Sequence, residues 1–151
     1  MSFWNSLRIG ASALTAQRLR LDIIANNIAN AETTRTETGE PYKRKDVVFA
    51  EQGSNKFLPQ LLKSLRGESN NASTNMAGVK VASIETDESE GSLVYDPTHP
   101  DANEEGYVEY PNVNLVVEMT NMLSATRSYE ANLSSIEAAK RMALKALEIG
   151  R

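Results

Sequence analysis

The sequence predicts a mainly α-helical protein with a small β-containing insert, in which long amphipathic helices at the two ends of the chain form a coiled coil. Apolar residues recur near both termini with alternating spacings of four and three, the pattern of helices that pack along their length. The prolines all lie between Pro41 and Pro111, so interruptions to helix fall in the middle of the chain. We therefore expect an N-terminal helix over 1–35, an extended and β-containing insert over 36–111, and a C-terminal helix over 112–151.

The N-terminal helix is expected to run from about Leu7 to Ala31. Its repeat consists of Leu7, Ala11, Leu14, Arg18, Leu21, Ala25 and Ile28. Arg18 is the one charged break in this repeat, and Ile24 widens the apolar stripe, as a helix with more than one neighbour requires. The asparagines and threonines that follow compete for backbone hydrogen bonds and therefore favour a helix end.

The C-terminal helix repeats the pattern at greater length, from Asn114 to Ile149. Its repeat consists of Leu115, Met119, Met122, Thr126, Tyr129, Leu133, Ile136, Lys140, Ala143 and Leu147. Asn112 or Asn114 can cap its first turn, and Gly150 ends it. At 1.5 Å per residue such a helix is roughly 50 Å long, so most of its stability must come from burying the apolar seam.

The insert contains segments with strand-like composition. These are Asp46–Phe49, Val79–Ile84, Leu93–Tyr95 and Tyr107–Tyr110. Apolar spacing also predicts a short helix from Phe57 to Leu65, ended by Gly67. Residues 67–78 are rich in Asn, Ser and Gly and poor in apolar side chains, which predicts a mobile loop.

No set of residues typical of catalysis, cofactor binding or metal binding is present. The chain has no cysteine, which excludes disulfides, thiol nucleophiles and the usual zinc sites. The single histidine, His99, lies in the acidic segment DPTHPDANEEG. A calcium-loop spacing begins at Asp101, but it places Asn112 where a bidentate Glu is required, so we interpret this segment as a rigid acidic turn. We predict no enzyme activity, no cofactor and no small-molecule substrate.

The charge pattern argues against nucleic acid and membrane partners. The net charge is −4, and the one basic cluster, Lys43 to Lys45, is followed directly by Asp46; nucleic-acid binding needs a larger basic surface. No stretch approaches the roughly 18 apolar residues of a membrane-spanning helix. The run between Arg8 and Arg18 is interrupted by Ser, Thr and Gln, so a cleaved signal peptide is not expected.

The terminal helices can either pair within a monomer and form its core, or also contact other copies. A two-helix hairpin buries one stripe on each helix, but both helices carry further apolar residues. These are Ile9 and Ile24 in the first helix, and Val116, Val117, Leu123 and Leu144 in the second. Because exposed apolar patches commonly mark interaction sites, these residues favour assembly. The expected partner-binding residues are Leu7, Leu14, Leu21, Ile24, Ile28, Leu115, Met119, Met122, Tyr129, Leu133, Ile136 and Leu147.

An antiparallel pair with level chain ends would place Leu7 near Leu147 and Leu21 near Leu133. Arg18 would then lie near Glu137. We expect Glu137 to pair with Arg18, because an unpaired charge on a buried seam is costly.

Three segments of the chain match a known family. These are ASALTAQRLRLDIIANNIANAETTRTETGEPYKRKDVVF, LVYDPTHPDANEEGYVEYPNVN and MTNMLSATRSYEANLSSIEAAKRMALKALEIGR. The first contains ANNIAN and resembles the N-terminal signature of bacterial flagellar rod, hook and hook-associated proteins. Within that group the three segments are most similar to proteins of the proximal rod. The resemblance covers both ends of the chain and the residues from Val79 onward.

The resemblance implies a structural subunit of the flagellar basal body. Such subunits are exported unfolded through the flagellar type III apparatus and polymerise, with copies of themselves and other rod proteins, into a hollow torque-transmitting shaft. Their terminal helices line the tube and the insert faces outward. By matched motif, Asn26, Asn27, Ile28, Asn30 and Thr34 help to fix the contacts that follow the first helix.

Two alternatives remain open from the sequence. A coiled-coil adaptor, or another axial protein of the hook type, would share the helical repeats. A small enzyme would need a separated acid and base, whereas Glu104 and Glu105 are adjacent.

Overall fold

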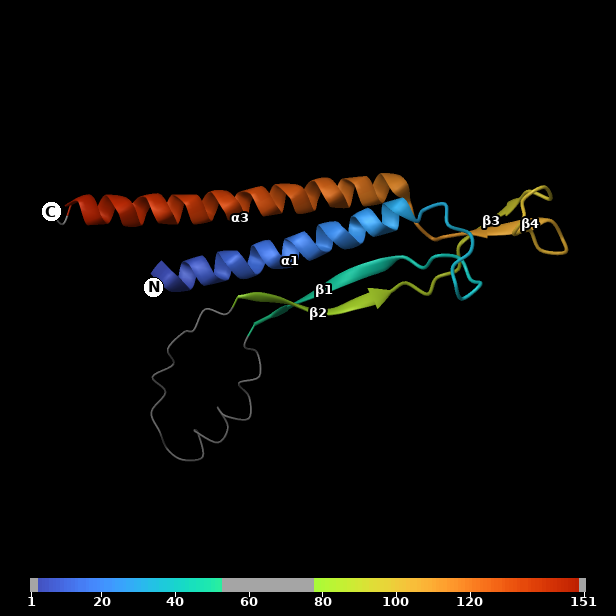
Figure 1. Cartoon of the computed structure of the whole chain (residues 1–151), viewed down its shortest axis with the longest axis horizontal. Coiled ribbons are helices and arrows are strands. Elements are labelled where there is room, and N and C mark those ends of the chain that lie inside the picture. Colours follow the sequence, from blue (N-terminus) through green and yellow to red (C-terminus); the bar gives the residue numbers. More distant parts are fainter. Residues whose placement is uncertain (1–2, 53–77, 150–151) are drawn as a thin grey trace, which may run out of the picture.

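The computed structural model describes residues 3–52 and 78–149. Two long helices lie side by side and run in opposite directions, a β-hairpin lies along the first of them, and a second hairpin extends from one end (Figure 1). Along the chain the described elements are α1 (Phe3–Ala29), β1 (Lys45–Glu51), β2 (Val79–Thr86), β3 (Ser92–Tyr95), β4 (Tyr107–Tyr110) and α3 (Leu115–Ile149). The mainly α-helical prediction with a small β-containing insert is therefore confirmed.

Helix α3 agrees with its predicted span to within one residue, whereas α1 begins four residues before the predicted Leu7 and ends two residues before the predicted Ala31. Asn114 caps α3, because its Oδ1 accepts hydrogen bonds from the backbone N–H groups of Val116 (3.0 Å) and Val117 (3.2 Å). This satisfies two of the donors that a helix leaves free in its first turn. The predicted ending at Gly150 lies outside the described residues.

The helix α1 lies between α3 and the β1–β2 hairpin and contacts both (Figure 1). Strands β1 and β2 are antiparallel, with an irregularity between Val48 and Phe49. This position explains why Ile24 is only 5% exposed: the apolar stripe of α1 is wide because it has two neighbours. The expectation that Ile24 would belong to an exposed apolar stripe on the monomer is therefore wrong.

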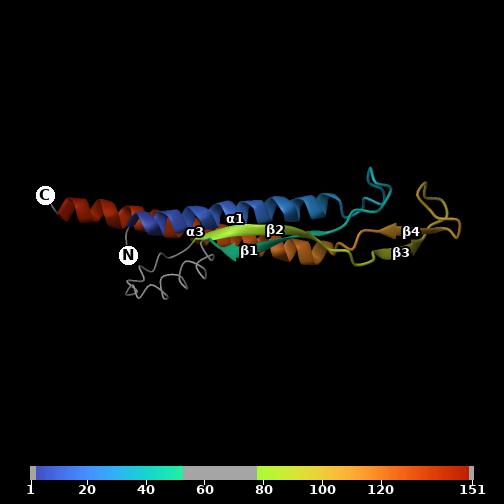
Figure 2. The ribbon, with the colours of Figure 1, turned by 90° about the horizontal axis from the view of Figure 1, so that it is seen from below.

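Strands β3 and β4 form a separate antiparallel hairpin at the end of the molecule farthest from both termini (Figures 1 and 2). Tyr95 pairs with Tyr107 and Val94 with Val108. Val108 is buried, whereas every residue of β3 is exposed. The loop between the strands turns at Gly106, whose φ of 83° is favourable only for glycine among common residues.

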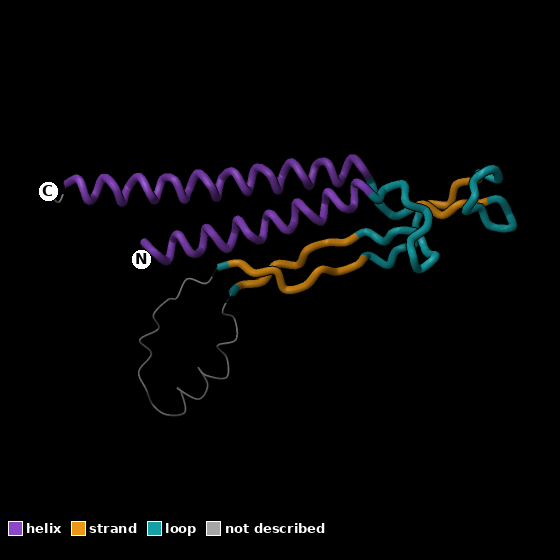
Figure 3. Tube along the Cα trace, in the orientation of Figure 1, coloured by secondary structure: helices purple, strands orange, loops and turns teal. Residues whose placement is uncertain are grey.

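The four predicted strand segments all form strands, which Figure 3 shows in orange as two separate pairs. The short helix predicted from Phe57 to Leu65, and the predicted mobile loop 67–78 up to residue 77, lie outside the described residues.

The helices pair with a different register from the one expected for level chain ends. Asn27 of α1 contacts Glu118 of α3, and Gly10 lies against Ile136, so facing residues have numbers that add to 145 or 146. Pairing Leu7 with Leu147 would require a sum of 154. The register is therefore offset by about eight residues, roughly two helical turns, and the C-terminal end of α3 extends past the start of α1 (Figure 1).

The register change also removes the expected Arg18–Glu137 pair. Arg18 and Glu137 are both exposed, and no ion pair joins them in the described part of the chain. The hypothesis rested on a buried Arg18. Because its side chain reaches solvent, its charge needs no partner.

Candidate functional site

A buried group of polar side chains joins α1, β1 and α3, and we call it the polar junction (Asn27, Tyr42, Arg44 and Glu118). Asn27 and Glu118 are each only 1% exposed, and Tyr42 is 9% exposed. Asn27 comes from the last turns of α1, Tyr42 and Arg44 from the chain entering β1, and Glu118 from the first turn of α3. Three segments that are far apart in sequence therefore meet at one buried position.

Asn27 uses both the donor and the acceptor capacity of its amide. Its Nδ2 donates to the carbonyl oxygen of Lys45 (2.8 Å) and to Glu118 Oε2 (3.2 Å). Its Oδ1 accepts from the Tyr42 hydroxyl (2.8 Å) and from the backbone N–H of Lys45 (3.0 Å). Because a buried polar group is stable only when it is hydrogen-bonded, Asn27 selects the position of the chain at Lys45.

Glu118 is the one buried carboxylate among the described residues, and Arg44 neutralises it. Arg44 Nε donates to Glu118 Oε1 at 2.9 Å, and the Arg44 side chain is 23% exposed. Burial lowers the pKa of Arg44, but the hydrogen bond and the negative charge of Glu118 outweigh this effect. The pKa of Arg44 therefore lies above the ordinary value for arginine. The ion pair thus connects the chain just before β1 to the first turn of α3.

The Tyr42 hydroxyl remains protonated in this environment. Burial raises the pKa of the Tyr42 phenol, and the negative charge of Glu118 raises it further. Both effects disfavour a second negative charge, so the hydroxyl keeps the proton that it donates to Asn27 Oδ1.

The other motif residues act at the surface around the junction. Asn30 Nδ2 donates to the carbonyl oxygen and to Oδ1 of Asn26, each at 2.9 Å, and the Asn30 backbone N–H donates to the same carbonyl at 3.1 Å. The Thr34 hydroxyl donates to Asp101 Oδ2 at 2.8 Å, and Arg35 lies 3.5 Å from Asp101 Oδ1. The chain after α1 is thus tied to the β3–β4 loop.

The predicted seam residues of α3 fall into two groups. Met122, Tyr129 and Ile136 are half-buried, on the face that carries the fully buried Glu118 and Ala125. The remaining predicted residues of α3 are exposed: Leu115 44%, Met119 55%, Leu133 42% and Leu147 73%. In α1, Leu7, Leu14, Leu21 and Ile28 are half-buried. The face of α3 that packs inside the chain is therefore rotated from the predicted seam, and it repeats through Glu118, Met122, Ala125, Tyr129, Asn132, Ile136, Ala139 and Ala143.

Val116, Val117, Leu123 and Leu144 are exposed, as the sequence predicts for apolar residues beyond one seam. Leu115, Met119, Leu123 and Leu133 lie on one side of the helix, and we call them the α3 stripe.

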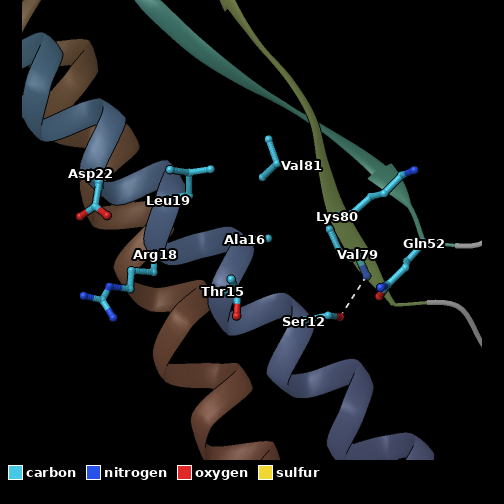
Figure 4. Close-up of a pocket in the computed structure, with 10 residues that line it drawn as sticks. All are labelled: Ser12, Thr15, Ala16, Arg18, Leu19, Asp22, Gln52, Val79, Lys80 and Val81. Carbon is cyan, nitrogen blue, oxygen red and sulfur yellow. Dashed lines mark hydrogen bonds between the residues drawn. The ribbon is translucent and has the colours of Figure 1, made fainter.

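A groove of about 540 Å³ lies between α1 and β2 (Figure 4). Its walls include Ala16 and Leu19 from the helix and Val81 from the strand. The Ser12 hydroxyl is occupied by structural hydrogen bonds: it donates to the Ile9 carbonyl (2.7 Å) and accepts from the backbone N–H of Val79 (3.1 Å), the bond drawn in Figure 4. The Ser12 hydroxyl therefore serves the local structure and is not activated by a neighbouring base.

The acidic segment around His99 folds as a turn held by its own side chains. His99 Nδ1 accepts from the backbone N–H of Asp101 (3.1 Å), and Asp96 accepts from the hydroxyl (2.7 Å) and N–H (3.0 Å) of Thr98. These hydrogen bonds lower the pKa of Asp96. Within residues 3–52 and 78–149, no three His, Asp or Glu side chains are grouped as metal ligands. None of the helices in this part of the chain combines the length and hydropathy needed to cross a membrane.

Comparison with known proteins gives matches at both ends of the chain. Residues 7–35 match the family described as "Flagella basal body rod protein", and residues 104–149 match "Flagellar basal body rod FlgEFG protein C-terminal". The chain is 48% identical over 155 residues to the flagellar basal-body rod protein FlgC of Bacillus subtilis, covering 100% of both proteins. It is 46% identical over 158 residues to FlgC of Borreliella burgdorferi, covering 99% of this chain and 98% of that protein. It is 38% identical over 151 residues to FlgC of Salmonella typhimurium, covering 100% of both.

Proposed function

The chain belongs to the family of the flagellar basal-body rod protein FlgC and is a structural subunit of the bacterial flagellar basal-body rod; from this premise we propose that it joins neighbouring rod subunits through the α3 stripe. The observation that carries the proposal is the exposure of these four apolar residues, which ranges from 42% to 55%. They lie outside the face that packs on α1, so intramolecular pairing leaves them in water. Burying them against a neighbour would recover roughly 25 cal/mol for each Å² of apolar surface.

The pairing of α1 with α3 supports a coiled-coil role for the helices within this assembly. The face of α3 toward α1 keeps the four-three alternation over eight positions, which is the spacing of helices that remain in contact over several turns. At Gly10 a Cβ atom would lie 2.7 Å from Ile136 Cγ1, so the two backbones approach closely there.

The polar junction supports a mechanical role for the subunit. A shaft transmits torque only if the parts of each subunit move together. The Asn27–Lys45, Asn27–Glu118 and Arg44–Glu118 contacts connect the insert to both helices, so a load on the insert passes to α1 and α3 together.

We infer that the partners are copies of this chain, other rod proteins and the flagellar export apparatus, and that the chain leaves the cell interior through that type III apparatus. We further infer that it has no catalytic activity, no cofactor and no nucleic acid partner.

Substitution on the α3 stripe tests the proposal. Leu123→Asp places a charge on the stripe, while Ser124→Asp places the same charge on the next, exposed position outside it. Both variants are expressed in a strain that lacks its own copy of this rod subunit. We expect Ser124→Asp to restore swimming, and Leu123→Asp to reduce the number of basal bodies with complete rods by at least about tenfold. The two purified proteins should be equally helical by circular dichroism. A Leu123→Asp chain that assembles normally would refute the role of the stripe.

A further inference from the structure

The two ends of this elongated molecule carry opposite charge. Between Val81 and Thr126 the sequence contains ten acidic residues and no Lys or Arg. Nine of the ten lie between Glu85 and Glu109, in the end of β2, the β3–β4 hairpin and their loops (Figure 1). The end of the molecule formed by the β3–β4 hairpin is therefore strongly acidic.

Three of the cations close to this acidic end are paired within the chain, while Lys45, the cross-strand partner of Thr86, forms no ion pair among the described residues. Arg35 pairs with Asp101 (3.5 Å), Lys43 with Glu40 (3.1 Å) and Arg44 with Glu118 (2.9 Å). By contrast, Glu88, Glu90, Glu104 and Glu105 are exposed and form no ion pair among the described residues. These carboxylates remain available to an external cation.

The opposite end of the molecule is basic. The last turns of α3 carry Lys140, Arg141 and Lys145. Two acidic residues lie beside them: Glu137, one turn before Lys140 and Arg141, and Glu148, which is paired with Lys145 at 2.7 Å. Arg8 adds a further positive charge at the beginning of α1, where its guanidinium donates to Asn5 Oδ1. Lys140 and Arg141 are exposed.

Each charged end also presents apolar side chains to water. On the β3–β4 hairpin, Leu93 (67% exposed), Tyr95 (64%) and Tyr107 (41%) share one side, because Tyr95 and Tyr107 are cross-strand partners and Leu93 is two residues from Tyr95. We call this surface the hairpin face. An isolated two-stranded hairpin is only marginally stable in water, so covering this face would stabilise it.

The end of α3 is uncovered because of the helix register. Residues that face each other have numbers adding to 145 or 146, so Phe3, the first described residue of α1, faces about residue 143. Leu144 and Leu147 lie past this point and are 52% and 73% exposed. Lys140, Leu144 and Leu147 recur at spacings of four and three and share one side of the helix; we call them the helix tip.

We propose that the helix tip of one copy of this chain docks on the hairpin face of a second copy, head to tail. Leu144 and Leu147 pack against Leu93, Tyr95 and Tyr107, while Lys140 and Arg141 lie among the carboxylates of the hairpin loops. Two like ends would bring the same charge together, which is unfavourable. A contact between two different surfaces does not close on itself and propagates along one direction, as a rod subunit requires. The inference rests on the proposed function and adds to it one contact, between the helix tip of one copy and the hairpin face of the next.

Cysteine crosslinking tests the geometry, because the natural chain has no cysteine. Leu93→Cys and Leu147→Cys are made as separate proteins and mixed under mild oxidation. Within one chain Leu147 lies near the C-terminal end of α3, and Leu93 lies in the hairpin beyond the N-terminal end of that helix. The helix of roughly 50 Å separates the two positions, far beyond disulfide reach. Head-to-tail docking predicts a mixed dimer at least about tenfold more abundant than either homodimer, and a ladder of oligomers from the chain that carries both cysteines. Homodimers that equal the mixed dimer, or no dimer at all, would overturn the proposal.

Charge exchange tests the electrostatic part of the contact. One cysteine chain receives the double change Lys140→Glu and Arg141→Glu, and the other receives Glu104→Lys and Glu105→Lys. Either double change alone is expected to lower the mixed-dimer yield by about tenfold. Mixing the two reversed chains is expected to restore the yield. Asp22→Lys, a matched reversal at an exposed position of α1 between the two ends, should leave the yield unchanged. Loss without recovery in the doubly reversed pair would refute the charge complementarity.

The outcome separates this contact from the function itself. If the wild-type chain restores swimming but the crosslink is absent, only the head-to-tail contact fails. If the wild-type chain restores neither rods nor swimming, the proposed function fails as well.

Discussion

Replacing Asn27 with alanine is expected to destabilise the protein by about 3 kcal/mol. The change removes all four hydrogen bonds of the amide and leaves the Lys45 N–H, the Lys45 carbonyl and the Tyr42 hydroxyl without their partner. Each buried polar group that loses its partner costs about 1–3 kcal/mol. Water that enters the space of the amide recovers part of the loss, which brings the expected total to about 3 kcal/mol.

Urea unfolding followed by circular dichroism at 222 nm measures this free energy. For a protein of this size, a loss of that magnitude corresponds to a fall in Tm of roughly 6–12 °C. Asn26→Ala is the matched control, because Asn26 is the preceding residue of the same type and is exposed. We expect the control to change stability by less than about 0.5 kcal/mol.

A second variant separates hydrogen bonding from volume. Asn27→Asp keeps the shape of the side chain but replaces the Nδ2 donor with an oxygen that faces Glu118 Oε2 at the present distance of 3.2 Å. At pH 7 it should cost at least as much as Asn27→Ala, because two acceptors then face each other in a buried site. The reasoning is refuted if Asn27→Ala and Asn26→Ala have the same stability, or if Asn27→Asp is as stable as the wild type.

Three further predictions concern the same packing. Arg44→Met should destabilise the chain by about 3 kcal/mol in urea unfolding, because it leaves Glu118 buried without its cation. The double variant Arg44→Met with Glu118→Leu, which removes both charges, should recover at least half of that loss. No recovery in the double variant would contradict the role of the ion pair. Gly10→Ala should lower Tm despite the better helix propensity of alanine, because its Cβ would lie 2.7 Å from Ile136 Cγ1; the loss should disappear in an Ile136→Ala background. The pKa of Tyr42 is raised in the folded chain, so the contribution of Tyr42 to stability is complete below the ordinary pKa of about 10 and is lost as pH rises through the folded pKa. The wild type should therefore lose more stability than Tyr42→Phe between about pH 9 and 11. Equal losses in the two proteins would refute this assignment.

Several parts of the structure could be predicted from local patterns because local physics determines them. The helical spans follow from apolar spacing, and Asn114 caps α3 as the preference of asparagine for that position predicts. The segments Val79–Ile84 and Tyr107–Tyr110 form strands where the composition predicts them. Each of these features depends on residues that are close together in sequence.

The sequence indicated a special role for Asn27 only through the ANNIAN resemblance. Its residue type suggested a polar helix end, whereas the structure places it in a buried network with Tyr42, Lys45 and Glu118. Glu118 was not singled out by any pattern, because a single Glu in the first turn of a helix is ordinary and its burial depends on two distant segments.

Amino-acid patterns alone establish two long amphipathic helices with more apolar surface than one pairing can bury, together with a small β-containing insert. Packing between distant segments sets which apolar residues are covered: Ile24 is buried in a helix that contacts both α3 and the β1–β2 hairpin, and the register of α1 on α3 leaves Leu144 and Leu147 beyond the first described residue of α1. The physical reason is that a four-three repeat specifies which side of a helix is apolar but allows several registers along it. The choice among them is made by contacts between distant residues, here the hydrogen bonds of Asn27 with Lys45 and Glu118 and the close approach of Gly10 to Ile136.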